Sequence, residues 1–141
     1  MVAVSRVDWN VLRSTAIDIR SRAYAPYSGF PVGAAGWAED GRVVAGCNVE
    51  NVSLGLTLCA ECVLVGNLIS AGGGRLVALA CVDGQGAALM PCGRCRQVLL
   101  EHAAPGMLID APDGPVALAD LLPHAFGPDQ VARGELGGHR A

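Results

Sequence analysis

Four of the chain's six cysteines form two short pairs with the same C-x-x-C spacing. The first pair lies in residues 59–62, with Glu61 between the cysteines, and the second lies in residues 92–95, directly after Pro91. Two such pairs in a reduced chain are typical of a zinc site, because thiolates are preferred zinc ligands. Four thiolates would close the metal in a structural site. Three would leave one position for water, and Glu61 could then move protons on that water.

A structural site with four thiolates is one interpretation of the pairs. Zinc ribbons use the same kind of pair, with a usual gap of about 15–20 residues between pairs. Ribbon pairs also lie on turns between strands. Here residues 63–91 separate the pairs, and each pair comes at the start of an expected helix. This weakens the ribbon interpretation without excluding it.

A catalytic site with three thiolates accounts for more of the local residues. Cys92 and Cys95 are three residues apart, so a first helical turn places both sulfurs on one side. Cys59 can supply the third sulfur, and the partial positive charge of helix N-termini favours thiolates. Glu61 could reach the open position and pass a proton from water to a substrate. The combined pattern, C-A-E followed by P-C-x-x-C, is the three-cysteine signature of zinc nucleobase deaminases.

The elements that must position these residues follow from the apolar periodicity and the turn residues. Helices are expected over residues 9–22, 59–71, 93–103 and, as one more turn, 118–122. Strands are expected over residues 32–38, 43–47, 76–82, 107–109 and 115–118. Asp8 is the expected N-cap of the first helix, and an Asp-Gly turn joins the first two strands into a hairpin. Helices alternating with strands around a mixed sheet predict an α/β layered domain.

Composition and charge limit the classes of function. A length of 141 residues with 52% hydrophobic residues suits one domain, and the apolar excess favours a symmetric homo-oligomer. The net charge of −3 and the aromatic content of 4% argue against a nucleic-acid groove, which needs clustered basic and stacking residues. No apolar stretch approaches the length of a membrane span, and no signal-peptide hydrophobic region follows Met1. We therefore expect a cytoplasmic protein with neither a membrane nor a nucleic-acid partner.

The chain resembles the small homotetrameric zinc-dependent cytidine deaminases over nearly its whole length. The matching stretches are YAPYS at 24–28 with Phe30, VGAA at 32–35, GCNVEN at 46–51, CAE at 59–61, PCGRCRQ at 91–97 and LLPHAF at 121–126. The resemblance implies a three-layer α/β/α fold with a five-stranded mixed sheet, and a homotetramer whose active sites are shared between subunits. It also implies one catalytic domain over residues 1–127, followed by a C-terminal tail over 128–141 that we expect to be mobile.

The resemblance further implies a reaction and a metal centre. Cys59, Cys92 and Cys95 would bind one zinc ion per subunit, and Glu61 would be the general acid/base. By this resemblance, the zinc-bound hydroxide would attack C4 of cytosine, and Glu61 would move protons first to N3 and then to the departing amine. The implied activity is hydrolytic deamination of cytidine and 2′-deoxycytidine to uridine and 2′-deoxyuridine, with release of ammonia, in pyrimidine salvage.

The contacts with the nucleoside substrate are implied in the same way. Asn48 and Glu50 would hydrogen-bond the ribose, and the backbone at Ala60 would contact the base edge. Phe30 and Phe126 would lie near the pyrimidine, with Phe126 arriving from a neighbouring subunit. Without the resemblance, Asn48 and Glu50 would be interpreted as polar groups that cap turns, and Phe126 as a core residue.

Two positions depart from the family pattern. Family members often carry Arg directly after the catalytic glutamate, where its charge offsets the thiolates, but this chain has Cys62 there. We hypothesise that Arg94, between the two ligands of the second pair, restores that charge. The second departure is Leu54, where many relatives carry Tyr near a neighbouring site. A deaminase for a modified nucleoside, such as an aminonucleoside antibiotic, and a closed four-thiolate module both stay open as alternatives.

Overall fold

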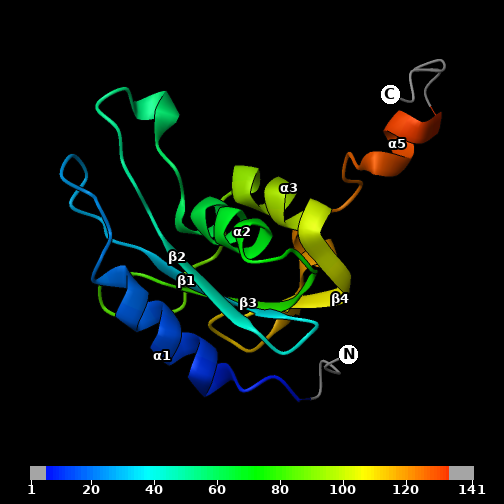
Figure 1. Cartoon of the computed structure of the whole chain (residues 1–141), viewed down its shortest axis with the longest axis horizontal. Coiled ribbons are helices and arrows are strands. Elements are labelled where there is room, and N and C mark those ends of the chain that lie inside the picture. Colours follow the sequence, from blue (N-terminus) through cyan, green and yellow to red (C-terminus); the bar gives the residue numbers. More distant parts are fainter. Residues whose placement is uncertain (1–5, 134–141) are drawn as a thin grey trace.

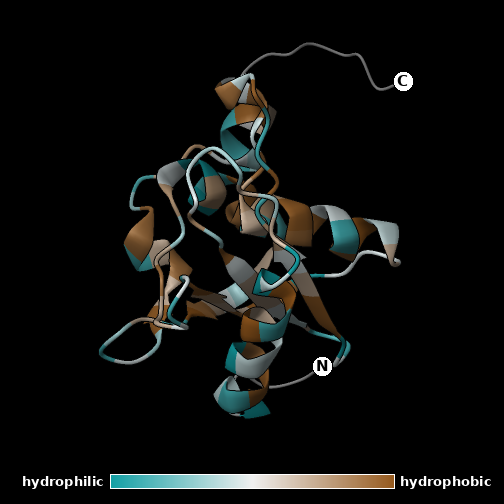
Figure 2. Cartoon of the chain, turned by 90° about the vertical axis from the view of Figure 1, so that its left-hand side faces the viewer, coloured by the Kyte–Doolittle hydropathy of each residue, from teal (hydrophilic) through white to brown (hydrophobic). Residues whose placement is uncertain are grey.

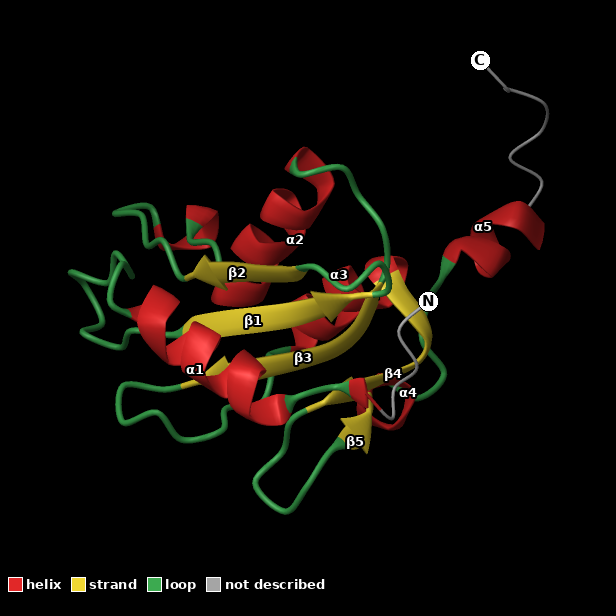
Figure 3. Cartoon of the chain, turned by 60° about the horizontal axis from the view of Figure 1, so that its bottom comes forward, coloured by secondary structure: helices red, strands yellow, loops and turns green. Residues whose placement is uncertain are grey.

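The computed structural model describes residues 6–133, which form one sheet between two layers of helices. The strands lie in the spatial order β2-β1-β3-β4-β5, and the pairing of β3 with β4 is parallel, whereas the other pairings are antiparallel. Their bounds are Gly33–Ala38 for β1, Val43–Cys47 for β2, Leu76–Val82 for β3, Ala103–Ile109 for β4 and Val116–Ala117 for β5. Figure 3 shows the strands side by side, with α1 on one face and α2 and α3 on the other. The predicted three-layer α/β/α fold with a five-stranded mixed sheet is therefore confirmed.

The helices differ in whether they pack against the sheet. Their bounds are Trp9–Arg20 for α1, Ala60–Ser70 for α2, Gly93–His102 for α3, Leu118–Leu121 for α4 and Pro128–Arg133 for α5, with a short 3₁₀ helix, η2, at Leu54–Leu56. α1, α2 and α3 pack against the sheet, whereas α5 stands apart from it, beyond α3 (Figure 1). Among residues 6–133, no helix combines the length and the apolar character that a membrane span requires.

Helix α1 begins where the sequence predicts. The Asp8 side chain accepts hydrogen bonds from the backbone amides of Asn10 and Val11 at 3.0 and 3.3 Å, which satisfies two of the free donors at the helix start. Teal and brown alternate along the helix in Figure 2, as expected for an amphipathic helix with one buried face. Leu12 and Ala16 form that face, and both are fully buried.

The β1–β2 hairpin and the central strand β3 also match their predicted ranges closely. All seven residues of β3 are buried, which fits a strand covered on both faces. Two glycines let the helices approach the hairpin from opposite sides. A side chain at Gly33 would overlap the Ala16 carbonyl of α1, and one at Gly46 would overlap the Leu64 backbone of α2. Gly33 therefore sets how closely α1 lies on the sheet, and Gly46 sets how closely α2, with its cysteines, lies on it.

The later elements differ from their predicted ranges. β4 begins at Ala103, four residues before the expected strand, because its backbone pairs with Leu76 ahead of the irregular segment at Pro105-Gly106. Pairing with a neighbouring strand is not visible in local composition, so the early start could not be predicted. Residues 128–133 of the expected tail form α5. The predicted mobility of that tail stays a prediction, and its remaining residues, 134–141, lie outside the described residues.

Candidate metal centre and active site

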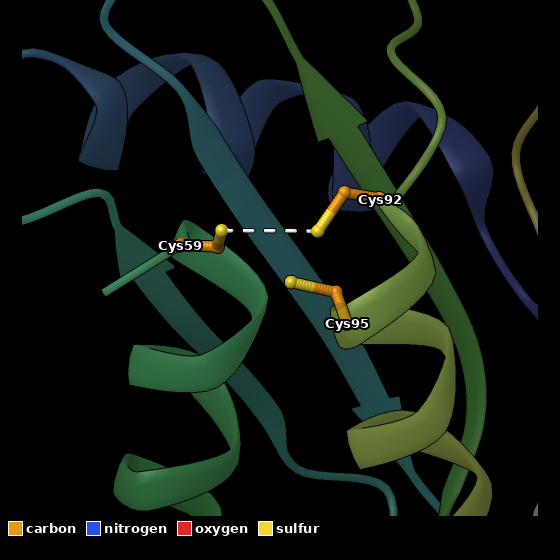
Figure 4. Close-up of side chains that lie close together, drawn as sticks. All are labelled: Cys59, Cys92 and Cys95. Carbon is orange, nitrogen blue, oxygen red and sulfur yellow. Dashed lines mark hydrogen bonds between the residues drawn. The ribbon is translucent and has the colours of Figure 1, made fainter. Parts of the chain in front are cut away.

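The N-termini of α2 and α3 bring three cysteine sulfurs together. Cys59 is the residue before α2, Cys92 is the residue before α3, and Cys95 lies in the first turn of α3. The three Sγ atoms all lie within 4.8 Å of one another, and those of Cys59 and Cys92 are 3.9 Å apart. Figure 4 shows the three side chains pointing toward one another from the two helix starts. The predicted grouping of these three thiols is therefore present in the fold.

The spacing of these sulfurs fits a tetrahedral zinc ion. Zinc–sulfur bonds of about 2.3 Å in tetrahedral geometry place two sulfurs roughly 3.8 Å apart. The Cys59–Cys92 separation of 3.9 Å matches that value. Thiolates are soft ligands that favour zinc over magnesium or calcium. The donor set and the distances together mark this cluster as a candidate zinc centre with three protein ligands.

Cys62, the remaining cysteine of the first pair, lies beside this cluster rather than in it. It is not part of the group whose sulfurs all lie within 4.8 Å. The Sγ of Cys62 is 3.8 Å from the Sγ of Cys95 and 4.0 Å from Nη2 of Arg94. A metal at the centre of the three-sulfur group is therefore not closed by a fourth thiolate. This geometry disfavours the four-thiolate module among the described residues.

The protein environment acts differently on the three thiols. Burial raises the pKa of Cys59, and burial together with the negative charge of Glu61 raises that of Cys95. Burial also works against ionisation of Cys92. The backbone amide of Cys95 and the thiols of Cys95 and Cys59 outweigh it, however, and the pKa of Cys92 falls below its ordinary value. Metal binding must therefore displace protons from at least two thiols near neutral pH.

Glu61 is a buried carboxylate next to the sulfur cluster. It lies in the first turn of α2, is 4% exposed, and accepts a hydrogen bond from the Cys95 thiol at 3.5 Å. Glu61 lines a cavity of about 190 Å³ together with Cys59, Cys92 and Asn48. A carboxylate and the open side of the sulfur cluster thus face one small space. That arrangement can activate water and pass its proton to a bound molecule.

The walls of this cavity include residues that the sequence did not single out. Val32, Thr57, Leu89 and Met90 line it, together with the predicted Ala60. Leu89 and Met90 come just before Pro91 and the second cysteine pair, and this closeness in sequence was the signal that could have identified them. The backbone just before Cys92 is held by a residue of α3. The Arg96 guanidinium donates to the Pro91 carbonyl at 2.8 Å and to the Leu121 carbonyl at 3.0 Å.

Asn48 and Glu50 fasten the loop that precedes β1. The Asn48 side chain accepts from the Val32 amide and donates to the Phe30 carbonyl, both at 2.9 Å. The Glu50 carboxylate accepts from the backbone amides of Tyr27 and Ser28 at 3.0 and 3.1 Å, and hydrogen bonds with Ser28 lower the pKa of Glu50. Asn48 also lines the cavity, whereas Glu50 lies outside its lining. Within the chain, both residues therefore contact loop backbone, in keeping with the alternative interpretation as polar groups that cap turns.

The two phenylalanines lie outside the cavity lining of the single chain. Phe30 is 51% exposed, and Phe126 is 64% exposed. Phe126 lines a separate hollow of about 410 Å³ near α3 and α5, and its carbonyl accepts a hydrogen bond from Nε2 of Gln97 at 2.8 Å. Its exposure contradicts the interpretation of Phe126 as a core residue. The fold of one chain therefore does not bring Phe126 to the sulfur cluster.

Arg94 is an exposed cation at the edge of the sulfur cluster. Its Nη2 donates to the Thr57 carbonyl at 2.9 Å and contacts the Cys62 sulfur. The contact with Cys62 and the charges of Cys62, Cys59 and Cys95 raise the pKa of Arg94, so the guanidinium stays charged. Its direct sulfur contact is with Cys62, the thiol outside the group of three.

The chain matches a known protein family over most of its described length. The family model of the cytidine and deoxycytidylate deaminase zinc-binding region matches residues 9–109. A cytidine deaminase from Mycobacterium tuberculosis is 65% identical over 127 residues, which cover 90% of this chain and 96% of that protein. A cytidine deaminase from Sporosarcina psychrophila is 40% identical over 118 residues, which cover 80% of this chain and 87% of that protein.

Solved structures show the same similarity in three dimensions. The crystal structure of cytidine deaminase from Mycobacterium tuberculosis is 67% identical in sequence, with a TM-score of 0.84 and coverage of 86% of this chain and 98% of that chain. The structure of cytidine deaminase from Mycobacterium leprae is 56% identical, with a TM-score of 0.81 and coverage of 83% and 98%. The sheet and its flanking helices are therefore arranged as in these two proteins.

Proposed function

This chain belongs to the cytidine and deoxycytidylate deaminase family, and we propose that it hydrolyses cytidine and 2′-deoxycytidine to uridine and 2′-deoxyuridine with release of ammonia. The observation that carries the proposal is the meeting of three thiols and the buried Glu61 carboxylate at one small cavity. The reaction would serve pyrimidine salvage. We place it in the cytoplasm, where the chain's six free cysteines stay reduced.

Cys59, Cys92 and Cys95 would hold one zinc ion per subunit. The chemistry that such an ion supplies when bound is the activation of water as a nucleophile near neutral pH. Glu61 would take one proton from the attacking water and deliver it to N3 of the cytosine ring as the water oxygen bonds to C4. Glu61 would then carry the second proton of that water to the amine, so that the C4–N bond breaks, ammonia leaves and the oxygen stays on C4 as the carbonyl. Because Glu61 is 4% exposed, competing proton exchange with bulk water is restricted.

The nucleoside would lie between the sulfur cluster and the loop that precedes β1. Asn48 faces the cavity and would hydrogen-bond the sugar. Glu50 would do the same through its second carboxylate oxygen, since Oε1 is the atom that holds the loop. The backbone at Ala60, in the cavity wall, would contact the base edge. Phe30, whose carbonyl is fixed by Asn48, would stack near the ring.

We further propose a homotetramer in which Phe126 completes the site of a neighbouring subunit. Large apolar side chains are exposed in the loop around η2, where Val52, Leu54 and Leu56 are 66–76% exposed. Phe126 is similarly exposed at 64%. Exposed apolar groups in such number favour burial in an interface. Sedimentation of the purified protein would give the mass of four chains, and a monomer that is active on cytidine would contradict this assembly.

Mixed assembly tests the shared site directly. A Phe126→Ala subunit keeps Glu61, and a Glu61→Gln subunit keeps Phe126, so both pure variants should have low activity. If Phe126 serves a neighbour, mixing the two after reversible dissociation should restore part of the activity. If Phe126 served its own chain, the mixture would show only the sum of the two separate activities.

A direct assay tests the proposed reaction. Ammonia release should be measured with cytidine, 2′-deoxycytidine, deoxycytidylate and adenosine as separate substrates. We expect turnover of the first two, and loss of that turnover when a chelator removes zinc. Turnover of deoxycytidylate alone, or of none of the four, would contradict the proposal.

A further inference from the structure

The proposed mechanism gives Cys62 no task, although its position is unusual. It is a half-buried thiol in the first turn of α2, outside the group of three sulfurs that would hold a metal. Yet its Sγ lies 3.8 Å from the Sγ of Cys95, about as close as the ligands lie to one another. A metal ion in the group would leave Cys62 as an uncoordinated thiol in contact with a coordinated one.

We propose that Cys62 is an oxidation site, and that its disulfide with Cys95 withdraws a ligand from the metal centre and reversibly switches the enzyme off in the presence of peroxide. The inference rests on the proposed role of Cys95 as a zinc ligand.

Two features of the structure make this pair the reactive one. A disulfide requires a sulfur–sulfur distance of about 2.0 Å, so the two sulfurs must approach each other by roughly 1.8 Å from their separation of 3.8 Å. Both cysteines lie in the first turns of their helices, where side-chain rotation needs no change in the sheet. Cys59 and Cys92 are also close, at 3.9 Å, but a bound metal would occupy both sulfurs. Cys62 is the member of the four that stays free to meet an oxidant.

The other two cysteines of the chain are poor candidates for the same chemistry. Cys81 is fully buried in β3, and Cys47 lies half-buried in β2. Among the described residues, the sulfur–sulfur contacts join Cys59 to Cys92 and Cys62 to Cys95, and neither Cys81 nor Cys47 takes part in one. Cys47 therefore serves as a matched control, because it is a half-buried thiol without such a contact to another cysteine.

The reaction needs hydrogen peroxide as the oxidant and proceeds in two steps. The Cys62 sulfur attacks one peroxide oxygen, the O–O bond breaks, and Cys62 becomes a sulfenic acid while one water leaves with the thiol proton. The Cys95 sulfur then attacks the Cys62 sulfur, so that an S–S bond forms and the S–O bond breaks. The departing hydroxyl takes a proton from solvent and leaves as the second water. Two electrons have passed from the two sulfurs to the two peroxide oxygens.

The consequence for the metal centre follows from ligand number. After oxidation, Cys59 and Cys92 would be the two remaining thiolates, whereas zinc sites use three protein ligands or more. The ion is therefore released. A dithiol reductant reverses the step by exchange, returns both thiols and allows zinc to bind again.

The test uses zinc-loaded full-length protein exposed to hydrogen peroxide in the presence of a colorimetric zinc chelator. Zinc release is followed over time, and peptides are mapped by mass spectrometry without reduction after alkylation of free thiols. The same measurements are made on Cys62→Ala, on Cys62→Ser as a second variant in case the first folds poorly, and on Cys47→Ala. We expect a Cys62–Cys95 crosslink in wild type and Cys47→Ala, with zinc release several-fold slower in the Cys62 variants. Dithiothreitol with added zinc should restore the metal content.

Equal rates of zinc release in wild type and the Cys62 variants would overturn the proposal. So would a crosslink that joins Cys59 to Cys92 instead. Neither readout depends on turnover, so deaminase activity measured before peroxide is added reports separately on the proposed function. A protein that lacks the activity but forms the Cys62–Cys95 crosslink and releases zinc would contradict the proposed function, while the inferred oxidation site and its effect on the metal would stand.

Discussion

The helix starts at residues 59–62 and 92–95 have the same cysteine spacing, but the fold uses them differently. The second contributes both of its sulfurs to the metal-binding group. The first contributes one sulfur, the Glu61 carboxylate and a thiol outside the group, Cys62. Equal spacing therefore does not give equal function, because the packing of α2 against α3 decides which sulfurs face the common centre. With this asymmetry, a metal ion held by the three sulfurs would keep its fourth position open to water.

The largest difference should appear between the two variants that each remove the last cysteine of one pair. We expect Cys95→Ala to lose zinc and to lower turnover by more than about 100-fold, beyond the cost of changing a residue around the ligands. Cys62→Ala should retain zinc and most of its turnover. For both variants, atomic absorption measures the zinc content and ammonia release measures the turnover. Loss of zinc from Cys62→Ala would instead support the four-thiolate module.

Zinc affinity should depend steeply on pH. The pKa values of Cys59 and Cys95 lie above the ordinary value, so in the metal-free protein these thiols hold their protons near neutral pH. Binding must displace those protons, and affinity should therefore rise with pH by roughly tenfold per unit for each proton released. Competition with a chelator of known affinity at several pH values around neutrality, from about pH 6 to about pH 8, measures how steeply zinc affinity changes with pH. A flat profile would show that the thiols are already ionised.

Removing the cation at the second helix start should have a smaller effect. Arg94→Gln takes away the charge that lies beside Cys62 and near the ligands. We expect about a tenfold loss of catalytic rate together with weaker zinc retention, at the lower end of the cost of an outer-shell change. Arg94→Lys is the matched control, because it keeps the charge. If the rate and zinc retention of Arg94→Gln equal those of wild type, the hypothesis of charge compensation fails.

The two cysteines that precede their helices should also differ in reactivity, by a smaller factor. In metal-free protein the pKa of Cys92 lies below the ordinary value, whereas burial raises that of Cys59. Because the thiolate is the nucleophile, iodoacetamide should modify Cys92 several-fold faster than Cys59 at mildly alkaline pH. Peptide mapping at short times measures the two rates. The reverse order would mean that the environments of the two helix starts are assigned wrongly.

The sequence allowed much of the fold and part of the site to be predicted. Helix periodicity and turn residues placed α1, the hairpin and β3, because these elements are specified by local patterns. The grouping of Cys59 with Cys92 and Cys95 was predicted from helical spacing and from the family resemblance. The contact between Cys62 and Cys95 was not predicted, since it depends on how two helices pack. The early start of β4 likewise depends on pairing with a strand distant in sequence.

The loop contacts illustrate the same limit. The family resemblance implied that Asn48 and Glu50 contact a sugar, but it did not predict that both would hold the loop that carries Phe30. Phe126 is exposed in the single chain, so the role proposed for it depends on an assembly that one sequence cannot specify.

The central claim is that Glu61 moves protons at an open position beside three thiolates. The most direct test replaces Glu61 with Gln, which keeps the size of the side chain and removes its basicity. Zinc content and ammonia release from cytidine are then measured on the same preparation. We predict that zinc is retained while turnover falls by about 10²–10⁴-fold, the usual contribution of a general acid/base. Turnover close to wild type with zinc in place would contradict the account.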